Sequence, residues 1–297
     1  MKVLITGAQG QVGRALARSA PIGADVVALA REALDITDAA RVAAIVREIK
    51  PNVIINAAAY TAVDRAEAEQ DRAAAINVHG PAYLAAAAAR AGARLVHIST
   101  DYVFAGDRPT PARPTDATEP TNVYGATKLA GEHAVLSALP ERSIILRTSW
   151  VYAADGHNFV RTMLRLMREK GAVRVVADQF GVPTAASSVA DTIWRLIAHD
   201  GLRGIFHWCD AGIASWYDFA VAIAEEGFAR GLVAGDVEVT PIATAEFPTP
   251  ARRPAFSVLD CDATVEVTGL RRVHWRTNLR RVLEETSLGG NEDCVGC

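Results

Sequence analysis

Tyr124 and Lys128 stand four residues apart in the segment YGATKLAGE, downstream of Ser99-Thr100-Asp101. Residues at positions i and i+4 share one face of a helix, so the phenol and the ammonium are expected to point into the same cleft. A cation beside a phenol favours the phenolate and lowers a pKa that starts near ~10. Such a tyrosine can exchange a proton near neutral pH, so this spacing indicates proton-transfer chemistry.

A glycine-rich loop near the start of the chain offers a nucleotide site. It follows an apolar, strand-like run and opens a helical pattern, and its spacing is GxxGxxG. Glycines let the backbone approach a phosphate, and the N-terminus of a helix presents free N–H groups. The alternative is that the loop is only a tight turn before a surface helix and binds no nucleotide. The residues expected to contact the cofactor are Gly7, Gln9, Gly10, Gln11, Val12 and Gly13. Combined with the Tyr-Lys pair, the loop indicates proton transfer coupled to hydride transfer.

The end of the second expected strand distinguishes two cofactors. An acid at that point binds the ribose 2′-hydroxyl of NAD, but Arg31 stands close to it here. An arginine suits a 2′-phosphate through bidentate, charge-assisted hydrogen bonds. This favours NADPH, and NADH stays possible if Glu32 takes the position instead. Asp35 and Ile36 are expected to flank the adenine, although the run ending at Asp38 is also typical of a helix N-cap.

Composition excludes several classes of protein. Half of the 297 residues are hydrophobic, 22% are charged, and the net charge of −3 comes without a basic run. These values are typical of a globular domain and argue against nucleic acid as a partner. No apolar run reaches the roughly 18 residues of a membrane span, and the start of the chain lacks the pattern of a secretory signal. We therefore expect a cytoplasmic protein without membrane contact.

The four cysteines and seven histidines form no metal or disulfide pattern. Four cysteines are too few for a disulfide scaffold at this length, and Cys209 and Cys261 are expected to be ordinary buried thiols. Cys294 and Cys297 form a single CxxC in a Gly-rich segment. We expect two reduced thiols in a flexible tail over 287–297, and no metal site.

Strand and helix patterns alternate along the first half of the chain. Strands are expected over 2–6, 26–30, 53–56, 95–99, 143–147, 173–177 and 205–208. Helices are expected over 11–20, 38–50, 71–91, 124–139, 159–170, 187–199, 216–230 and about 277–285. Such alternation predicts an α/β fold, a Rossmann-type doubly wound parallel sheet with a smaller C-terminal substrate-binding lobe.

The domain division follows from the same pattern. We expect a dinucleotide-binding domain over 1–150, with a returning segment at about 172–208. The substrate-binding lobe is expected to comprise 151–171 and 209–286. Small residues after the third strand, Ala57, Ala58 and Ala59, would let the nicotinamide half of a cofactor lie against the backbone. Asn77, a polar residue in an Ala-rich helix, is more typical of a structural hydrogen bond.

Several segments together resemble the dTDP-4-dehydrorhamnose reductase family, in the extended branch of the short-chain dehydrogenase/reductase superfamily. The resemblance runs in family order from residue 1 to about 285. The segments that carry it are NAAAYTAVD, STDYVF, YGATKLAGE, RTSWVY, DQFGVPT and PTPARRP. The last three make the resemblance far more specific than the Thr, Tyr and Lys set alone.

The resemblance implies reduction of the 4-keto group of dTDP-4-dehydro-β-L-rhamnose by NAD(P)H, giving dTDP-L-rhamnose. It implies that Tyr124 donates the proton to O4 and that Thr100 hydrogen-bonds the same oxygen. It also implies that Lys128 holds the nicotinamide ribose and keeps Tyr124 acidic. The residues it places near the sugar nucleotide are Thr61, Val63, Asp101, Tyr102, Trp150 and Asn158, with Arg252 or Arg253 at the diphosphate and Trp216 as a further candidate.

One departure from the family concerns metal and assembly. Some members form a magnesium-linked dimer through glutamates, and here those places read Arg14-Ala15 and Ala186-Ser187. A hard cation needs several oxygen ligands, so we expect a monomer or a weak homodimer. Two alternatives stay open. One is another sugar-nucleotide reductase or epimerase of the superfamily, and the other is a regulatory subunit that binds nucleotide without turnover.

Overall fold

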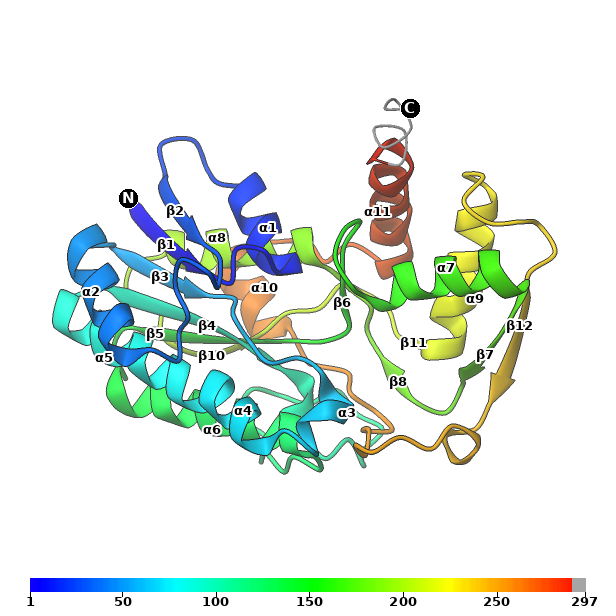
Figure 1. Ribbon diagram of the computed structural model, residues 1–297, viewed down its shortest axis with the longest axis horizontal. Helices are drawn as coiled ribbons and strands as arrows, with labels where there is room; N and C mark the ends of the chain where they lie inside the picture. The colour runs from blue at the N-terminus through cyan, green and yellow to red at the C-terminus, as the bar shows by residue number, and fades with distance from the viewer. Residues whose placement is uncertain (290–297) are drawn as a thin grey trace.

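Six parallel strands form the main sheet of the protein. The computed structural model describes residues 1–289, and the strands pair in the order β10-β5-β4-β3-β1-β2 (Figure 1). Their bounds are β1 (Lys2–Thr6), β2 (Asp25–Leu29), β3 (Val53–Asn56), β4 (Arg94–Thr100), β5 (Ser143–Thr148) and β10 (Gly204–His207). The strand order reverses direction at β1, so the sheet is doubly wound as predicted, and ligands are expected at the carboxyl ends of its strands.

Helices cover both faces of this sheet. One face carries α2 (Ala39–Ile49), α5 (Gly80–Ala91) and α6 (Val123–Ala138), and the other carries α1 (Gln11–Arg18), α8 (Ala186–Ala198) and α10 (Asp262–Thr268). Alternate strand residues enter opposite cores: Leu4 and Ile54 pack with the first helices, and Val3 and Ile55 pack with the second. Strands buried on both faces explain the continuous apolar runs of the sequence.

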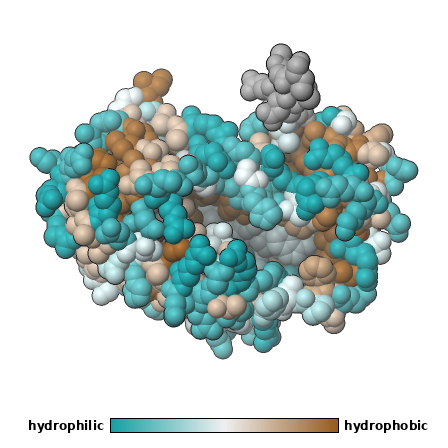
Figure 2. Space-filling view, viewed as in Figure 1, coloured by the Kyte–Doolittle hydropathy of each residue, from teal (hydrophilic) through white to brown (hydrophobic). Residues whose placement is uncertain are grey.

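A smaller lobe packs beside the carboxyl ends of the strands, and the surface is hollowed between the two parts (Figure 2). Its helices are α7 (Phe159–Lys170), α9 (Trp216–Phe228) and α11 (Trp275–Gly289). Three two-stranded sheets pair β6 (Val151–Tyr152) with β9 (Thr184–Ala185), β7 (Ala172–Val176) with β12 (Glu238–Ile242), and β8 (Phe180–Gly181) with β11 (Ala214–Ser215). The lobe has a hydrophobic core of its own.

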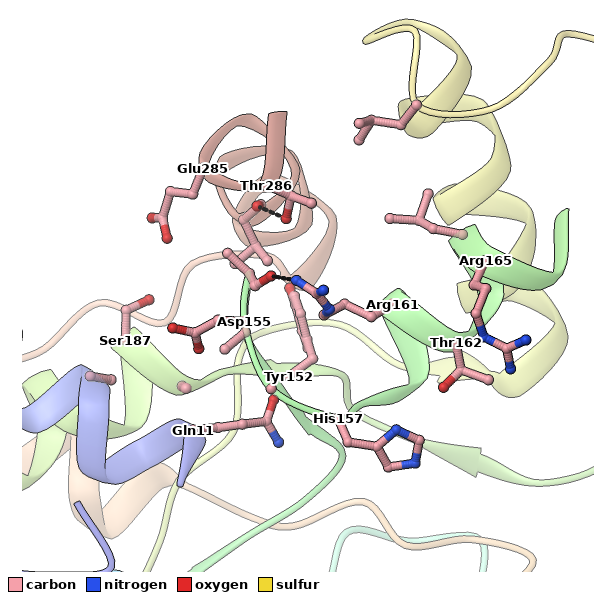
Figure 3. Close-up of a pocket in the computed structure, with 18 of the residues that line it drawn as sticks. Gln11, Tyr152, Asp155, His157, Arg161, Thr162, Arg165, Ser187, Glu285 and Thr286 are labelled. Carbon is pink, nitrogen blue, oxygen red and sulfur yellow. Dashed lines mark hydrogen bonds between the residues drawn. The ribbon is translucent and has the colours of Figure 1, made fainter. Parts of the chain in front are cut away.

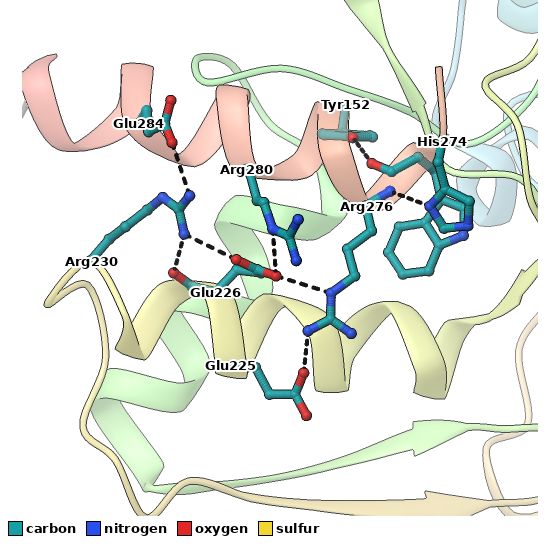
Figure 4. A network of polar contacts seen from close by, with 9 residues as sticks. Tyr152, Glu225, Glu226, Arg230, His274, Arg276, Arg280 and Glu284 are labelled. Atoms are coloured by element: carbon teal, nitrogen blue, oxygen red, sulfur yellow. Dashed lines mark hydrogen bonds and ion pairs between the residues drawn. The ribbon is translucent and has the colours of Figure 1, made fainter. Parts of the chain in front are cut away.

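An ion cluster ties two helices of the lobe together (Figure 4). Glu226 on α9 accepts hydrogen bonds from Arg276 and Arg280 of α11, at 3.0 and 2.9 Å, and pairs with Arg230 at 3.1 Å. The Glu226 side chain is only 10% exposed. Three guanidinium groups around one shielded carboxylate outweigh its desolvation, and they hold its pKa below the usual range despite burial.

The Ala-rich helix expected over 71–91 is interrupted. It consists of α4 (Gln70–Ala74), the π-helical turn η1 (Ala75–His79) and α5. Asn77 lies in the π-helical turn, where its amide accepts from the Tyr60 N–H at 2.8 Å and donates to the Tyr60 carbonyl at 3.1 Å. The structural role expected for Asn77 is confirmed, and it accompanies a wider helical turn that periodicity does not reveal.

One strand of the expected returning segment lies elsewhere. The run at 173–177 was expected beside the main sheet, but β7 pairs with β12 in the smaller lobe. Only α8 and β10 of residues 172–208 join the main sheet and its core. The expected boundary at 172 is therefore wrong for β7, because a short apolar run does not show which sheet a strand joins.

Most other elements begin and end within two residues of the expected positions. Helix α11 begins two residues earlier and runs longer than expected. The elements that were not predicted are α3 (Val63–Ala66), η2 (Asp101–Val103), η3 (Thr244–Glu246), α10, β6, β8, β9, β11 and β12. Of the expected tail, residues 290–297 with Cys294 and Cys297 lie outside the described part of the chain. Within residues 1–289, no helix has both the length and the hydropathy of a membrane span.

Candidate active site

The glycine-rich loop forms a tight cradle between β1 and α1. Gly7 has φ +69°, and a Cβ there would lie 2.6 Å from the Ala58 nitrogen. A Cβ on Gly13 would lie 2.2 Å from the Gly7 carbonyl oxygen. Gly10 is the N-cap of α1 and brings no side chain that could bind the first-turn N–H groups. The cradle therefore fits the backbone-to-phosphate approach predicted for Gly7 to Gly13.

The residues expected at the adenosine end lie after β2. The Arg31 guanidinium pairs with Asp35 at 3.2 Å, and its side chain is 63% exposed. Hydrogen bonds from the Thr37 N–H and hydroxyl lower the pKa of Asp35. The Ile36 side chain is 3% exposed and packs in the core, where a Cβ on Gly80 would meet its Cδ1 at 2.5 Å. The predicted contact between Ile36 and adenine is not tested, and the burial of this side chain in the core argues against it. Asp38 accepts from the Arg41 N–H as the N-cap of α2, as one expectation had it.

The segment after β3 lies against the glycine loop. Ala57, Ala58 and Ala59 are half-buried, and the Ala57 N–H donates to the Thr6 carbonyl at 3.2 Å. The Asn56 carboxamide oxygen accepts from the Thr6 hydroxyl at 2.7 Å and from the Ala58 N–H at 3.2 Å. These contacts fix the backbone on which the nicotinamide half is expected to lie.

Tyr124 lies near the start of α6, and its ring contacts that of Tyr102 edge to face, with centroids 5.5 Å apart. Asn122, the N-cap of this helix, accepts from the Gly125 N–H at 2.8 Å. Burial raises the pKa of Tyr124 to about 12, opposed by a hydrogen bond with Thr100. The lowered pKa expected from sequence is thus wrong for the free protein, because desolvation of the phenolate outweighs the Thr100 hydrogen bond and the Asp101 carboxylate acts in the same direction as desolvation.

Lys128 follows one turn later and is 2% exposed. Its Nζ donates to the Ile98 carbonyl at 2.7 Å and lies 3.3 Å from His97 Nε2. Burial lowers the pKa of Lys128 to about 8, while Glu132 opposes this shift. The amine is therefore held against β4 in the structure and can change its charge near neutral pH.

Thr100 and Asp101 stand where β4 ends and η2 begins. The Thr100 hydroxyl accepts from the Tyr102 N–H at 3.2 Å and donates to Asp101 at 2.9 Å. Asp101 is 2% exposed, and burial raises its pKa to about 6. Thr100 ends β4, Lys128 donates to Ile98 of the same strand, and Tyr124 interacts with Thr100, so the three side chains lie near the carboxyl end of β4.

Trp150 and Trp216, two candidates 66 positions apart in the sequence, stack face to face with centroids 3.4 Å apart and planes 6° apart. Trp150 has φ +47°, a left-handed conformation that costs free energy for a bulky residue. Its indole lies over Gly181 of the DQFGVPT segment, where a Cβ would meet Trp150 Cε2 at 2.5 Å. The stack forms an aromatic wall on the lobe side.

The PTPARRP segment is held over α3. Arg253 pairs with Asp64 at 2.7 Å and donates to the Thr249 hydroxyl at 2.6 Å. The Arg252 side chain is exposed, and its carbonyl accepts from Asn122 at 2.8 Å. Because the guanidinium of Arg253 already has an anionic partner, Arg252 is the better candidate for a diphosphate.

Asn158 has a different surrounding from the one expected. It is the N-cap of α7, and its amide nitrogen donates to the carbonyls of Ala153 and Asp155 and to Gln11 Oε1 at 3.0 Å. Its amide thus links the first turn of α1 to the lobe and has little capacity left for a sugar. Thr61 is exposed and Val63 is half-buried at the start of α3, where both remain candidates.

A cavity of about 1480 Å³ opens between α1, α7 and α11 (Figure 3). Gln11, Tyr152, Asp155 and Arg161 line it, and Arg161 donates to the Ala154 carbonyl at 2.7 Å. Thr100, Tyr124 and Lys128 do not line it. Proximity of the chemical groups therefore identifies the site better than cavity size. Among residues 1–289, no three His, Cys, Asp or Glu side chains form a group that could hold a metal ion.

Sequence reasoning did not assign several residues that build this site. Asn122 and Asp64 position α6 and the PTPARRP segment, and His97 contacts Lys128. Asn122 could have been found, because an Asn directly before a helix is an N-cap signal. Asp64 and His97 could not, since their partners are distant in sequence.

Comparisons with known proteins all point to one family. The family model described as RmlD substrate binding domain matches residues 1–288. A dTDP-4-dehydrorhamnose reductase of Burkholderia thailandensis is 45% identical over 290 residues, covering 93% of this chain and 96% of the relative. The structure of a dTDP-4-dehydrorhamnose reductase from Clostridium acetobutylicum superposes with a TM-score of 0.89 at 42% identity, covering 96% of this chain and 99% of the other. One from Bacillus anthracis, in complex with NADP, gives 0.89 at 40% identity, also covering 96% and 99%.

The doubly wound sheet, the glycine cradle and the Thr, Tyr and Lys set define an extended short-chain dehydrogenase/reductase. Within that superfamily, the matches over nearly the whole length of the chain are decisive. The chain belongs to the dTDP-4-dehydrorhamnose reductase family.

Proposed function

We propose that this protein reduces the 4-keto group of dTDP-4-dehydro-β-L-rhamnose to give dTDP-L-rhamnose, with NADPH as the preferred cofactor. Family membership supports the substrate. The observation that carries the chemistry is the position of Tyr124 at the start of α6, near Thr100 at the end of β4 and one helical turn before Lys128.

The cofactor fits the residues present. Gly7 and Gly13 leave room for a pyrophosphate at the start of α1, and Arg31 is exposed where a 2′-phosphate would lie. When bound, the reduced nicotinamide supplies the hydride that C4 of the sugar receives. Ala57 to Ala59 would form the surface against which its nicotinamide half lies, and Lys128 would donate to its ribose hydroxyls.

Tyr124 supplies the proton. Its raised pKa keeps the phenol protonated in the free protein, which suits a donor to the developing O4 alkoxide. An ammonium form of Lys128 beside the phenol would favour the phenolate that remains. Thr100 hydrogen-bonds the same oxygen, and positioned acid catalysis of this kind contributes about 10²–10⁴-fold.

The other side of the cleft binds the sugar nucleotide. The Trp150 and Trp216 stack and Tyr102 present apolar ring surface to the deoxyhexose. Thr61 and Val63 stand beside them at α3, and the exposed Arg252 is placed to meet the diphosphate. We propose a dTDP-sugar as the substrate and a monomer or weak homodimer as the assembly.

The test is oxidation of NADPH and of NADH by purified protein with dTDP-4-dehydro-L-rhamnose. We expect Tyr124→Phe to lose about 10²–10⁴-fold in turnover while it still binds cofactor. Tyr83→Phe, a half-buried tyrosine on α5, is the matched control and keeps turnover. Wild-type turnover in Tyr124→Phe would refute the assignment. Tight nucleotide binding without turnover in the wild type would favour another sugar nucleotide or a regulatory subunit.

A further inference from the structure

A continuous chain of buried polar atoms connects the glycine loop to Lys128. The Thr6 hydroxyl donates to Asn56 Oδ1 at 2.7 Å, and Asn56 Nδ2 lies 3.0 Å from His97 Nδ1. His97 Nε2 lies 3.3 Å from Lys128 Nζ, which donates to the Ile98 carbonyl. The four residues of this polar series are almost completely buried. Their exposed fractions are 0% for Thr6, 1% for Asn56, 0% for His97 and 2% for Lys128.

The orientation of the Asn56 amide is fixed by a neighbour that can only donate. The Ala58 backbone N–H points at Asn56 Oδ1 at 3.2 Å. Exchanging the amide oxygen and nitrogen would set two donors against each other, so the oxygen must face Ala58. Asn56 Nδ2 therefore faces His97 and donates to its Nδ1.

This donation determines the tautomer of His97. A ring nitrogen that accepts carries no proton, so Nδ1 is bare and the proton of the neutral ring is on Nε2. An imidazolium, with N–H on both nitrogens, would oppose Asn56 Nδ2. His97 Nε2–H consequently points at Lys128 Nζ.

An ammonium has three donors and no lone pair, so it cannot accept from His97. A neutral amine accepts through its lone pair and still donates to the Ile98 carbonyl. We propose that His97 is a positioning residue that holds Lys128 as the neutral amine at mildly alkaline pH in the cofactor-free protein. Protonation of the amine then breaks the contact and frees Nζ for the cleft. The change adds one proton from water to –NH₂ to give –NH₃⁺, and nothing is oxidised or reduced.

The groups around Lys128 are consistent with this assignment. Glu132 lies one turn further on the same helix, but it is bound by Arg147 of β5. Tyr124 on α6 and Asp101 and Tyr102 in η2 are the other titratable groups of the site, and burial disfavours the charged form of each. Burial likewise lowers the pKa of Lys128. A hydrogen bond donated to the neutral amine acts in the same direction.

The first test is the tautomer itself, which can be read from ¹⁵N chemical shifts of the histidine rings in the free protein. His97→Gln identifies the His97 signals, and His133→Gln, at an exposed site on α6, is the control for assignment. We expect a bare Nδ1 and a protonated Nε2. A protonated Nδ1, or both nitrogens protonated, would overturn the proposal. This measurement needs neither substrate nor turnover, so it is independent of the proposed function.

The second test inverts the chain of donors. In Asn56→Asp, a carboxylate can only accept, so His97 must carry its proton on Nδ1 and offer a bare Nε2 to the ammonium. We expect the alkaline limb of the pH profile of kcat/KM to move up by about one unit or more. NADPH binding at mildly alkaline pH should take up about one proton in the wild type and almost none in the variant. Calorimetry in buffers of different ionisation enthalpy measures this uptake.

A purely structural role for Asn56 and His97 predicts a different outcome. Activity would then fall equally at all pH values, with the limb and the proton uptake unchanged, and this result would also overturn the proposal. If the proposed sugar is not the substrate, proton uptake and the tautomer still decide the matter. If Asn56→Asp does not fold, the tautomer measurement decides alone.

Discussion

Two buried ionisable groups stand one turn apart on α6, and their surroundings are opposite. Glu132 is 0% exposed and receives Arg147 in a two-pronged pair, with Nη2 at 2.6 Å, as well as the Ser99 hydroxyl. Lys128 is 2% exposed and contacts a carbonyl and a neutral ring. Glu132 is bound to its counter-ion Arg147, whereas Lys128, which has no counter-ion of its own, has a pKa lowered to about 8 by burial. Helix α6 thus carries one carboxylate in a structural ion pair and one amine that is available for the chemistry of the site.

The largest effect should follow from breaking the paired ion. Glu132→Gln leaves the Arg147 guanidinium buried without its anion, and this costs about 3–5 kcal/mol of unfolding free energy. Equilibrium unfolding in urea measures the loss. Glu48→Gln, on the exposed face of α2, should change stability by less than about 0.5 kcal/mol. Equal effects in the two variants would remove the contrast between paired and unpaired ions.

Replacing Lys128, which has no counter-ion of its own, should instead remove the free-energy cost of burying its charge. The folded pKa of Lys128 is lowered from 10.5 to about 8, so between these values the unfolded chain binds more protons and stability rises with pH. Full stability is present above 10.5 and is lost as pH falls through about 8. We expect wild type to gain about 3 kcal/mol relative to Lys128→Met across this window. Parallel curves for the two proteins, measured by urea unfolding at several pH values, would contradict this.

Asp101 extends the contrast to an acid. Its pKa is raised from 3.8 to about 6, so between these values the folded state binds more protons and stability falls as pH rises. Wild type should lose about 2–3 kcal/mol relative to Asp101→Asn over that window. Paired melts of the two proteins at pH values on either side test this. A constant difference between them would show that Asp101 is not desolvated as its burial indicates.

The smallest effect on stability is expected for Arg31, a charged side chain that is largely exposed. Arg31 pairs with Asp35 on the surface, so Arg31→Ala should leave stability nearly unchanged. Loss of its bond to a 2′-phosphate should lower the preference for NADPH over NADH by about tenfold. The ratio of kcat/KM for the two cofactors measures this, with the exposed Arg41→Ala as control. An unchanged ratio would place the 2′-phosphate elsewhere.

The elements and the fold class could be predicted because both depend on local pattern. Apolar runs bounded by Gly and Pro predicted the six main strands to within one residue, and the run ending at Asp38 was expected to include a helix N-cap. The same holds for the family, since its motifs are contiguous segments. The type and order of these elements require no knowledge of distant contacts.

The electrostatics of the site could not be predicted in the same way. Spacing placed Lys128 near Tyr124 but could not show that both would be desolvated, and the expected sign of the Tyr124 shift was therefore wrong. Arg253 meets Asp64 across 189 positions of sequence, so its engagement was invisible. The bond from Asn158 to Gln11, 147 positions earlier, could not be predicted for the same reason.

The π-helical turn over Ala75–His79 has a consequence for how this chain tolerates change in length. A π-turn holds one residue more than the α-turn it replaces, so the residues of α5 are rotated by about 100° relative to a regular continuation of α4. Deleting one residue here would restore the regular spiral and turn the Asn77 amide away from Tyr60. Inserting or deleting one residue therefore rotates the side chains of α5 away from the surfaces they pack against. The 70–91 segment should admit substitutions far more readily than single-residue insertions or deletions.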